Sequence, residues 1–179
     1  MADILSDDLV RKVKAVKLLI LDVDGVLTDG RISYTEQGDE IKSFHAHDGH
    51  GIKFLVKAGI ECAIITVRSS GIVKRRAGEL GIKFVYQGVE NKDDAFEEIL
   101  GKLGITPPEA AYIGDDLPDL PVLTRVGFSA SVSDAVGEVR ARADYVTERP
   151  GGRGAVREVA ELILRTQGKW DQLVSGHSR

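Results

Sequence analysis

Two groups of aspartates are the residues of this sequence best suited to do chemistry. Asp22 and Asp24 directly follow the apolar run 18–21, and Gly25 then lets the chain turn sharply without a Cβ clash. Like charges this close repel one another in a partly buried place unless a cation or a shared proton compensates them. A lone pair of this kind would be better explained as a solvated turn. Its place directly after a fully apolar run, and a second acidic group downstream, favour carboxylates beside a cation.

The second group consists of Asp115, Asp116 and Asp119, which come after the apolar run 110–113. Because the ligand crevice of an open parallel α/β sheet lies at the carboxyl ends of its strands, we expect the two groups to converge. Hard oxygen ligands without a nearby sulfur favour Mg²⁺ over a transition metal. An ionised aspartate can attack phosphorus while a neighbouring acid protonates the departing oxygen. Together the two groups are typical of magnesium-dependent phosphoryl transfer.

Two further residues could hold a phosphate group. Thr66 ends a strand expected over 61–65 and precedes a basic helix that runs to Leu80, so its hydroxyl could join helix N–H groups around an anion. A threonine at that position is equally well explained as a helix cap. Lys92 begins a helix expected over 92–103, where its charge opposes the positive end of the helix dipole. A nearby anion would remove that conflict.

The elements that carry these residues alternate along the chain. Short apolar runs and helical patterns predict an α/β fold, with a Rossmann-like, three-layer parallel sheet. Two short runs within 31–44, with a turn signal at 36–39, predict a projecting β-hairpin, and Asp48 is expected to cap the next helix. The remaining strands are expected at 83–86, 126–130 and 143–146, and the remaining helices at 6–14, 48–57, 134–142 and 155–166.

Composition limits the possible functions. The chain has 179 residues, which favours one domain over 1–179, with a polar, mobile tail at 168–179. Its formal net charge of -4 and the lack of basic runs predict no nucleic-acid or membrane-surface partner. No apolar run approaches a membrane span, and no secretory signal pattern is visible, so we expect a cytoplasmic protein. Cys62 is the only cysteine, and its apolar neighbours predict a small core residue.

The order of the motifs resembles that of the haloacid dehalogenase superfamily of phosphohydrolases. DVDGV, the strand-terminal threonine, the lysine and GDDLPD follow one another as they do in that superfamily, over nearly the whole chain. The resemblance implies that Asp22 is the nucleophile, and that Asp24 is the general acid/base and also lends its backbone carbonyl to a Mg²⁺ ion. It further implies that Thr66 and Lys92 hold the phosphate, and that Asp115 is the second metal carboxylate.

The resemblance also assigns supporting roles, which orient the metal shell or its waters, to Asp116 and Asp119. Within the superfamily the chain is most similar to the phosphatases of 3-deoxy-D-manno-octulosonate 8-phosphate, which act in lipopolysaccharide precursor synthesis. The segments that carry this similarity are DVDGVLTDG, YQGVENK, GDDLPDLPV, ADYVT, GGRGAVRE and the QGK tail. Such enzymes lack a large cap and form homotetramers, in which hairpins build an intersubunit barrel and a neighbour's tail can close the site.

Substrate choice turns on Arg68. The related 2-keto-3-deoxynononate 9-phosphate phosphatases tend to carry Glu there, whereas Arg can bind a sugar-acid carboxylate through paired hydrogen bonds. Val67 departs from the family's usual Thr-Gly-Arg, and a valine would be awkward if the position needs a positive φ angle. The alternatives are therefore a phosphatase for another nonulosonate or sugar phosphate, and a non-catalytic phosphate-binding or structural module of the same fold.

Overall fold

A six-stranded parallel sheet forms the centre of the molecule, for which we analysed a computed structural model that describes residues 5–176. Its strand order is β5-β4-β1-β6-β7-β8, with β1 between β4 and β6. All neighbouring strands of this sheet run parallel. The strands are β1 (Leu18–Leu21), β4 (Glu61–Thr66), β5 (Phe84–Gln87), β6 (Ala110–Gly114), β7 (Phe128–Ser131) and β8 (Tyr145–Val146).

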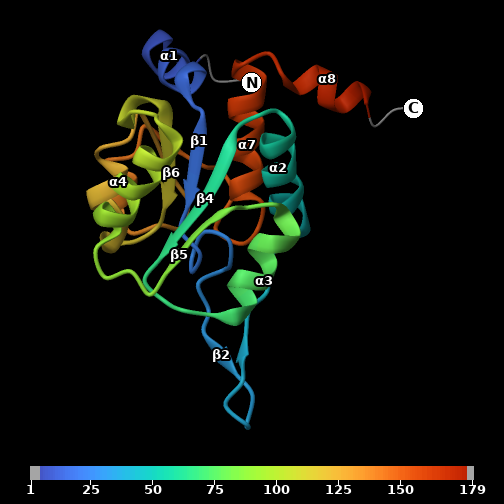
Figure 1. The fold of residues 1–179 in the computed structure, drawn as a ribbon, viewed down its shortest axis with the longest axis vertical. Helices are drawn as coiled ribbons and strands as arrows, with labels where there is room; N and C mark the ends of the chain where they lie inside the picture. Colours follow the sequence, from blue (N-terminus) through green and yellow to red (C-terminus); the bar gives the residue numbers. More distant parts are fainter. Residues whose placement is uncertain (1–4, 177–179) are drawn as a thin grey trace.

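Helices cover both faces of this sheet, which gives the predicted three layers. Figure 1 shows α2, α3 and α7 on one side of the sheet and α4 on the other. The sheet and its helices enclose one contiguous hydrophobic core. The helices are α1 (Asp7–Ala15), α2 (Ala46–Lys57), α3 (Gly71–Leu80), α4 (Lys92–Leu103), α5 (Leu120–Leu123), α6 (Gly137–Arg140), α7 (Ala155–Thr166) and α8 (Trp170–Ser175), with 3₁₀ turns η1 (Pro107–Glu109) and η2 (Leu117–Asp119).

The central strand sets the position of the site. All residues of β1 are buried, as a strand covered on both faces of a parallel sheet requires. Leu21 pairs in register with Ile64 of β4 and with Ile113 of β6. The residues that follow these three positions therefore lie together at the carboxyl ends of the strands. We call this end of the sheet the sheet edge, and it carries Asp22, Thr66 and Asp115.

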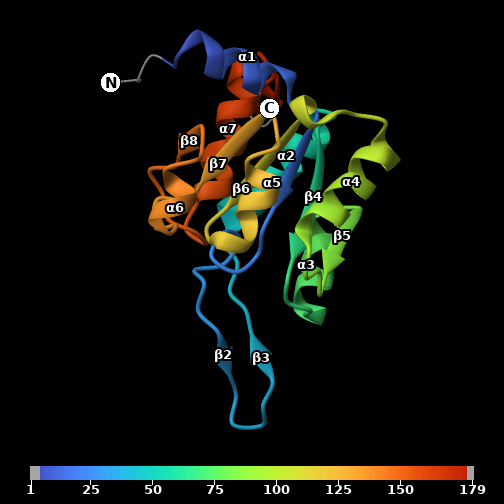
Figure 2. The ribbon, with the colours of Figure 1, turned by 90° about the vertical axis from the view of Figure 1, so that its left-hand side faces the viewer.

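A two-stranded antiparallel hairpin projects from that edge. Its strands, β2 (Ser33–Tyr34) and β3 (Glu40–Ile41), are shorter than predicted, and Gly38 turns the chain between them with a φ angle of 89°. Figure 2 shows the hairpin standing clear of the body of the molecule. The predicted fold class is confirmed, including the projecting hairpin and, within the described residues, the lack of a large cap.

Asp48 differs from its prediction. It was expected to cap the helix that follows the hairpin, but α2 begins at Ala46, with His45 as its N-cap residue. The buried Asp48 carboxylate instead accepts hydrogen bonds from the backbone N–H groups of Gly154, at 3.1 Å, and Arg157, at 2.8 Å. It caps α7, whose N-cap residue, Gly154, has no side chain with which to do so.

The predicted mobile tail also differs in part from the structure. Trp170 and Leu173 are buried, and they anchor a short helix, α8, within the segment 168–179. The guanidinium groups of Arg157 and Arg165 lie 5.1 and 4.7 Å from the Trp170 ring, in cation–π contacts. An aromatic side chain therefore outweighs the polar composition of this segment, while residues 177–179 lie outside the described part of the chain.

Two smaller findings bear on the expectations from composition. Cys62 is buried, as predicted for a core residue, and burial raises the pKa of its thiol. None of the helices in the described chain has the length and apolar character needed to cross a membrane.

Candidate active site

The carboxyl edge of the sheet holds a cavity of about 150 Å³. Every site residue predicted from the sequence lines it, so residues that are far apart in the chain meet here as expected. The lining consists of Asp22, Asp24, Thr66, Arg68, Lys92, Asp115, Asp116 and Asp119, together with Val67 and Pro118.

A buried lysine stands at the centre of the carboxylates. The Lys92 ammonium donates to Oδ1 of Asp22, at 2.7 Å, and to Oδ1 of Asp119, at 2.6 Å. Burial alone would lower the pKa of Lys92, but these two carboxylates raise it above its ordinary value. Lys92 does begin α4, and the protein's own carboxylates supply the anions that the sequence predicted near this unfavourable helix position.

Asp119 is held by hydrogen bonds on both of its oxygens. Oδ1 accepts from Lys92 and, at 2.6 Å, from the Tyr112 hydroxyl, while Oδ2 accepts from the backbone N–H groups of Asp115, at 2.8 Å, and Asp116, at 3.1 Å. These bonds fix the start of the turn after β6 and tie it to the lysine. Asp119 is thus positioned to support its neighbours, and its oxygens are already engaged.

Asp22 and Asp115 have strongly raised pKa values. Burial, followed by repulsion from Asp119, raises the pKa of Asp22 to about 7, against the opposing effect of Lys92. Burial, followed by repulsion from Asp22 and Asp119, raises the pKa of Asp115 to about 8. So much negative charge in one small cavity favours the binding of a cation, which would return both groups to their ionised forms.

The chemistry of this donor set fits a hard divalent ion such as Mg²⁺. Carboxylate oxygens of Asp22, Asp115 and Asp119 lie within 4.8 Å of one another, and they form the one such group found within residues 5–176. Gly25, at a φ angle of 97°, brings its backbone so near Asp115 that an added Cβ would lie 2.0 Å from Oδ2. Because Asp119 is engaged elsewhere, Asp22 and Asp115 are the carboxylates available to an ion.

Thr66 lies at the end of β4 and is buried against the cavity. The alternative explanation, a helix cap, was wrong, because α3 begins only at Gly71 and its N-cap residue is Ser70. The N–H groups of α3 accordingly start several residues after Thr66. The threonine side chain therefore belongs to the cavity.

Val67 follows in an ordinary backbone conformation. No non-glycine residue of the described chain has a positive φ angle, and the Val67 side chain is 45% exposed at the mouth of the cavity. The concern that a valine here would strain the backbone is therefore not supported. Its effect is limited to the shape of the mouth.

Asp24 pairs with Lys42 of the hairpin and with Arg68, and not with Lys92. Its carboxylate accepts a short hydrogen bond from Lys42, and Arg68 Nε lies 3.6 Å from its other oxygen. Glu40 completes the group, since its Oε1 accepts from Arg68 Nη2 at 2.9 Å and lies 3.4 Å from Lys42 Nζ. We call Asp24, Glu40, Lys42 and Arg68 the hairpin-base cluster.

Sequence reasoning missed three residues near the site, namely Tyr112, Glu40 and Lys42. Tyr112 is fully buried, and its hydroxyl donates a hydrogen bond to Asp119. The sequence could have indicated this residue, because it is the one hydroxyl-bearing side chain in the apolar strand before GDD. Lys42 has a side chain that is only 2% exposed, although it lies in a hairpin predicted to project from the fold. Nothing in its neighbours distinguishes it from a surface lysine.

The loop 150–154 packs against the turn that follows β1. Gly152 N–H donates to the Val26 carbonyl at 2.9 Å, and Gly151 N–H donates to Asp134 Oδ1 at 2.9 Å. An added Cβ on Gly151 would lie 1.7 Å from the Gly25 carbonyl oxygen. The glycines of this loop are therefore needed for close packing against the turn after β1.

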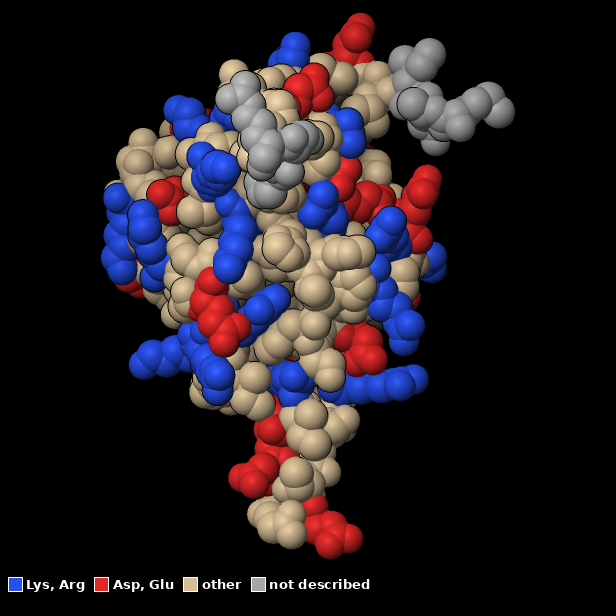
Figure 3. All heavy atoms as spheres, turned by 90° about the vertical axis from the view of Figure 1, so that its right-hand side faces the viewer, with Lys and Arg blue, Asp and Glu red and all other residues tan. Residues whose placement is uncertain are grey.

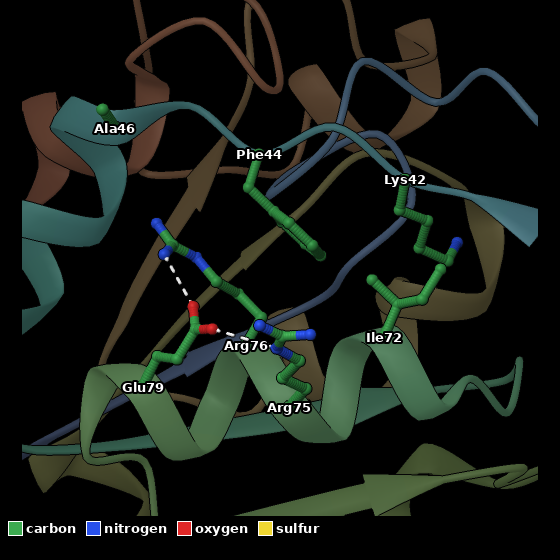
Figure 4. A pocket seen from close by; sticks show the side chains of 7 residues that line it. All are labelled: Lys42, Phe44, Ala46, Ile72, Arg75, Arg76 and Glu79. Carbon is green, nitrogen blue, oxygen red and sulfur yellow. Dashed lines mark hydrogen bonds and ion pairs between the residues drawn. The ribbon is translucent and has the colours of Figure 1, made fainter.

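A larger cavity, of about 460 Å³, lies between the base of the hairpin and α3. Figure 4 shows its aromatic and basic lining, in which Arg76 pairs with Glu79 and lies over the Phe44 ring at 5.7 Å. Lys42 also borders this cavity, whereas Asp24 and Arg68 line the smaller one. The hairpin-base cluster therefore lies between the two cavities. None of the aspartates of the sheet edge lines the larger cavity.

The parallel sheet, with a lysine among aspartates at its carboxyl edge, has the architecture of a haloacid dehalogenase-like hydrolase, and the family model of that description matches residues 82–158. The 3-deoxy-D-manno-octulosonate 8-phosphate phosphatase KdsC of Escherichia coli (strain K12) is 50% identical over 167 residues, which are 93% of this chain and 89% of the relative. The chain therefore belongs to the KdsC family of 3-deoxy-D-manno-octulosonate 8-phosphate phosphatases.

Solved structures of the family have the same fold as this chain. A 3-deoxy-D-manno-octulosonate 8-phosphate phosphatase from Yersinia pestis superposes with a TM-score of 0.91 at 47% identity, covering 92% of this chain and 89% of the other. The enzyme from Moraxella catarrhalis superposes with a TM-score of 0.93 at 46% identity, covering 96% and 98%. The Moraxella structure is a complex with a magnesium ion, a phosphate ion and a KDO molecule.

Proposed function

We propose that this protein hydrolyses 3-deoxy-D-manno-octulosonate 8-phosphate to the free sugar acid and inorganic phosphate, with Mg²⁺ as its cofactor. The observation that carries this proposal is the buried Asp22–Lys92–Asp119 arrangement at the edge of the sheet. It combines a candidate nucleophile, a cation for phosphate oxygens and a rigid support in one cavity. Family membership adds the substrate class.

In the proposed mechanism Asp22 attacks phosphorus and becomes an aspartyl-phosphate, while the bond to the sugar oxygen breaks. Asp24 protonates that departing oxygen, and in the second step it accepts a proton from the water that cleaves the acyl-phosphate. Thr66 and Lys92 would hold the phosphoryl oxygens, because both line the same cavity. The second step releases inorganic phosphate and returns the Asp22 carboxylate.

The Asp22 and Asp115 carboxylates and the Asp24 backbone carbonyl are the groups proposed to hold the magnesium ion. When bound, Mg²⁺ supplies positive charge that offsets both the carboxylates and the phosphate oxygens. Asp116 and Asp119 would act as supporting residues. The Asp116 side chain accepts from the Leu117 N–H at 2.7 Å and so caps the 3₁₀ turn η2.

The size of the cavity separates the binding of phosphate from that of the sugar. At about 150 Å³ it is much smaller than the roughly 300–1,000 Å³ of a site for a drug-sized ligand, so it suits the phosphoryl group. The sugar acid would then lie across the mouth, where Arg68 could bind its carboxylate through charge-assisted hydrogen bonds. This proposal gives Arg68 the choice of substrate and leaves phosphate chemistry to the sheet edge.

Self-association, as a homotetramer, is part of the proposal. Ile32, Tyr34 and Ile41 on the hairpin are 52%, 59% and 50% exposed, which is unusual for a hairpin that does not pack on another chain. In the view of Figure 3 the projecting part of the hairpin presents acidic and uncharged atoms, and Lys and Arg surround its base. A partner could both cover these apolar side chains and close the open mouth. The cytoplasmic location stays a prediction.

The first test measures phosphate release by the purified chain with Mg²⁺. The octulosonate phosphate, the nononate phosphate and p-nitrophenyl phosphate are compared, with EDTA as the control. We expect turnover that EDTA abolishes and that Mg²⁺ restores, with a clear preference for the octulosonate.

Equal release from all three substrates would leave phosphatase activity standing and remove the named substrate. Failure to release phosphate from any of them would remove the enzymatic function altogether. Turnover that persists in EDTA would contradict the metal requirement.

A further inference from the structure

The substrate-selecting arginine of the proposed function is held by a residue of the hairpin. Glu40, in β3, accepts a hydrogen bond from Arg68 Nη2 at 2.9 Å, which is the shortest contact that Arg68 makes. The Tyr34 hydroxyl lies farther from the same nitrogen, at 3.4 Å, and Asp24 faces Nε at 3.6 Å. The direction of the guanidinium is therefore set mainly by Glu40.

The rest of the guanidinium is left for another anion. Within residues 5–176, Arg68 Nε is buried and has no hydrogen-bond partner, although Asp24 attracts it from 3.6 Å. An arginine carries five N–H donors in a fixed fork, so a carboxylate that engages one edge leaves the others free. Because Arg68 lines the cavity of the aspartates, those remaining donors are placed beside the phosphate site.

The pairing within the hairpin-base cluster supports the same conclusion. The hairpin-base cluster contains two cations, Lys42 and Arg68, and two carboxylates, Asp24 and Glu40. Asp24 takes a short hydrogen bond from the buried Lys42, so its own hold on Arg68 is the weaker one. A substrate carboxylate could replace Asp24 at Arg68 without breaking the bond to Glu40.

We propose that Glu40 is a positioning residue, which fixes the Arg68 guanidinium so that it selects phosphate esters bearing a carboxylate. This inference rests on the proposed function and deepens it, because it places part of the selection on the hairpin of the same chain. Selection then depends on the Glu40–Arg68 bond, whereas phosphate hydrolysis as such depends on the sheet edge.

The test compares selectivity rather than activity alone. Selectivity is the ratio of kcat/KM for the octulosonate phosphate to kcat/KM for p-nitrophenyl phosphate, which has no carboxylate. We expect Glu40→Gln to lower this ratio about tenfold, chiefly through a higher KM for the sugar acid. This is the size expected when the acceptor of a charge-assisted hydrogen bond becomes neutral and the bond weakens. Glu40→Asp, which keeps the charge but shortens the side chain, should give a smaller loss.

A double-mutant cycle shows whether the effect passes through Arg68. Arg68→Ala should lower the ratio at least as far as Glu40→Gln, and adding Glu40→Gln to Arg68→Ala should lower it no further. The matched control is Glu36→Gln, which removes the same charge from an exposed position at the hairpin turn and should leave the ratio unchanged. Thermal unfolding of each variant checks that it is folded.

Three outcomes would overturn the inference. The ratio could stay constant in Glu40→Gln, the loss could persist undiminished in the Arg68→Ala background, or both substrates could slow equally, as expected if Glu40 acts only through Lys42. The unmodified protein is measured first. If it shows no preference for the octulosonate phosphate, the proposed substrate fails, and the role of Glu40 in its selection fails with it.

Discussion

The sheet edge and the hairpin-base cluster both pair lysine or arginine with carboxylates, but these side chains are held in place in different ways. At the sheet edge, Asp22 and Lys92 lie at the ends of buried elements, and the core fixes them. In the hairpin-base cluster, Glu40 and Arg68 are 18% and 39% exposed and are fixed mainly by each other. The turn after β4 joins the two regions, since Thr66 belongs to the edge and Arg68 to the cluster.

This difference separates two tasks. A group that must meet phosphorus within a fraction of an ångström is best held by a rigid scaffold. A group that selects among sugar acids can be held by paired surface charges, because each such pair contributes little stability and adjusts easily. We therefore expect changes at the sheet edge, and at the proposed general acid/base Asp24, to reduce all turnover. Changes at Glu40 and Arg68 should instead alter the choice of substrate.

The largest expected effect separates the two regions most clearly. Asp22→Asn removes the proposed nucleophile but keeps the shape of the side chain, so we expect turnover of every substrate to fall by about 10⁴-fold or more. Thermal unfolding should show a folded protein. Substantial activity in this variant would mean that another group attacks phosphorus.

A change at a residue that supports the proposed reacting groups should have an intermediate effect on turnover. Asp119→Asn keeps an acceptor for Lys92 and Tyr112 but sets an amide against the N–H groups of Asp115 and Asp116. We expect turnover to fall by about 10–100-fold, equally for sugar-acid and aryl phosphates, with weaker Mg²⁺ binding. A loss confined to the sugar acid would break the proposed division between the regions.

The smallest effect is expected between the two regions. Because Val67 has an ordinary backbone conformation and lies half-exposed, Val67→Gly should change kcat/KM by less than about threefold. Stability should fall by about 0.4–1 kcal/mol, since a glycine loses more backbone entropy on folding. Denaturant unfolding and steady-state kinetics measure both. A large gain in activity would mean that valine does obstruct the substrate.

Much of the scaffold could be predicted from the sequence, because periodicity and caps act locally. The bounds of β1, α4 and α7 are those expected from the apolar runs and helix signals. The convergence of the predicted site residues followed from one topological rule, that parallel strands end at a common edge. Errors at other element ends reach three residues. The helix expected from 134 begins at Gly137, and the strand expected from 143 begins at Tyr145.

The hydrogen-bond partners of charged side chains could not be predicted in the same way. Asp48 had the sequence context of a cap for its own helix, yet it caps a helix more than a hundred residues away. Nothing in the sequence around Lys42 indicated a buried side chain, and only the fold brings it against Asp24. Such pairings depend on tertiary positions that neither propensity nor spacing encodes.

The cap that Asp48 provides for α7 has a consequence for the order of folding. The contact from Asp48 to Gly154 spans 106 residues, and it holds the loop that packs on the turn after β1. Contacts this distant in sequence form only after long loops have closed. On the ribosome every candidate catalytic residue emerges well before this support, so we expect nascent chains to stay inactive until the C-terminal segment is made.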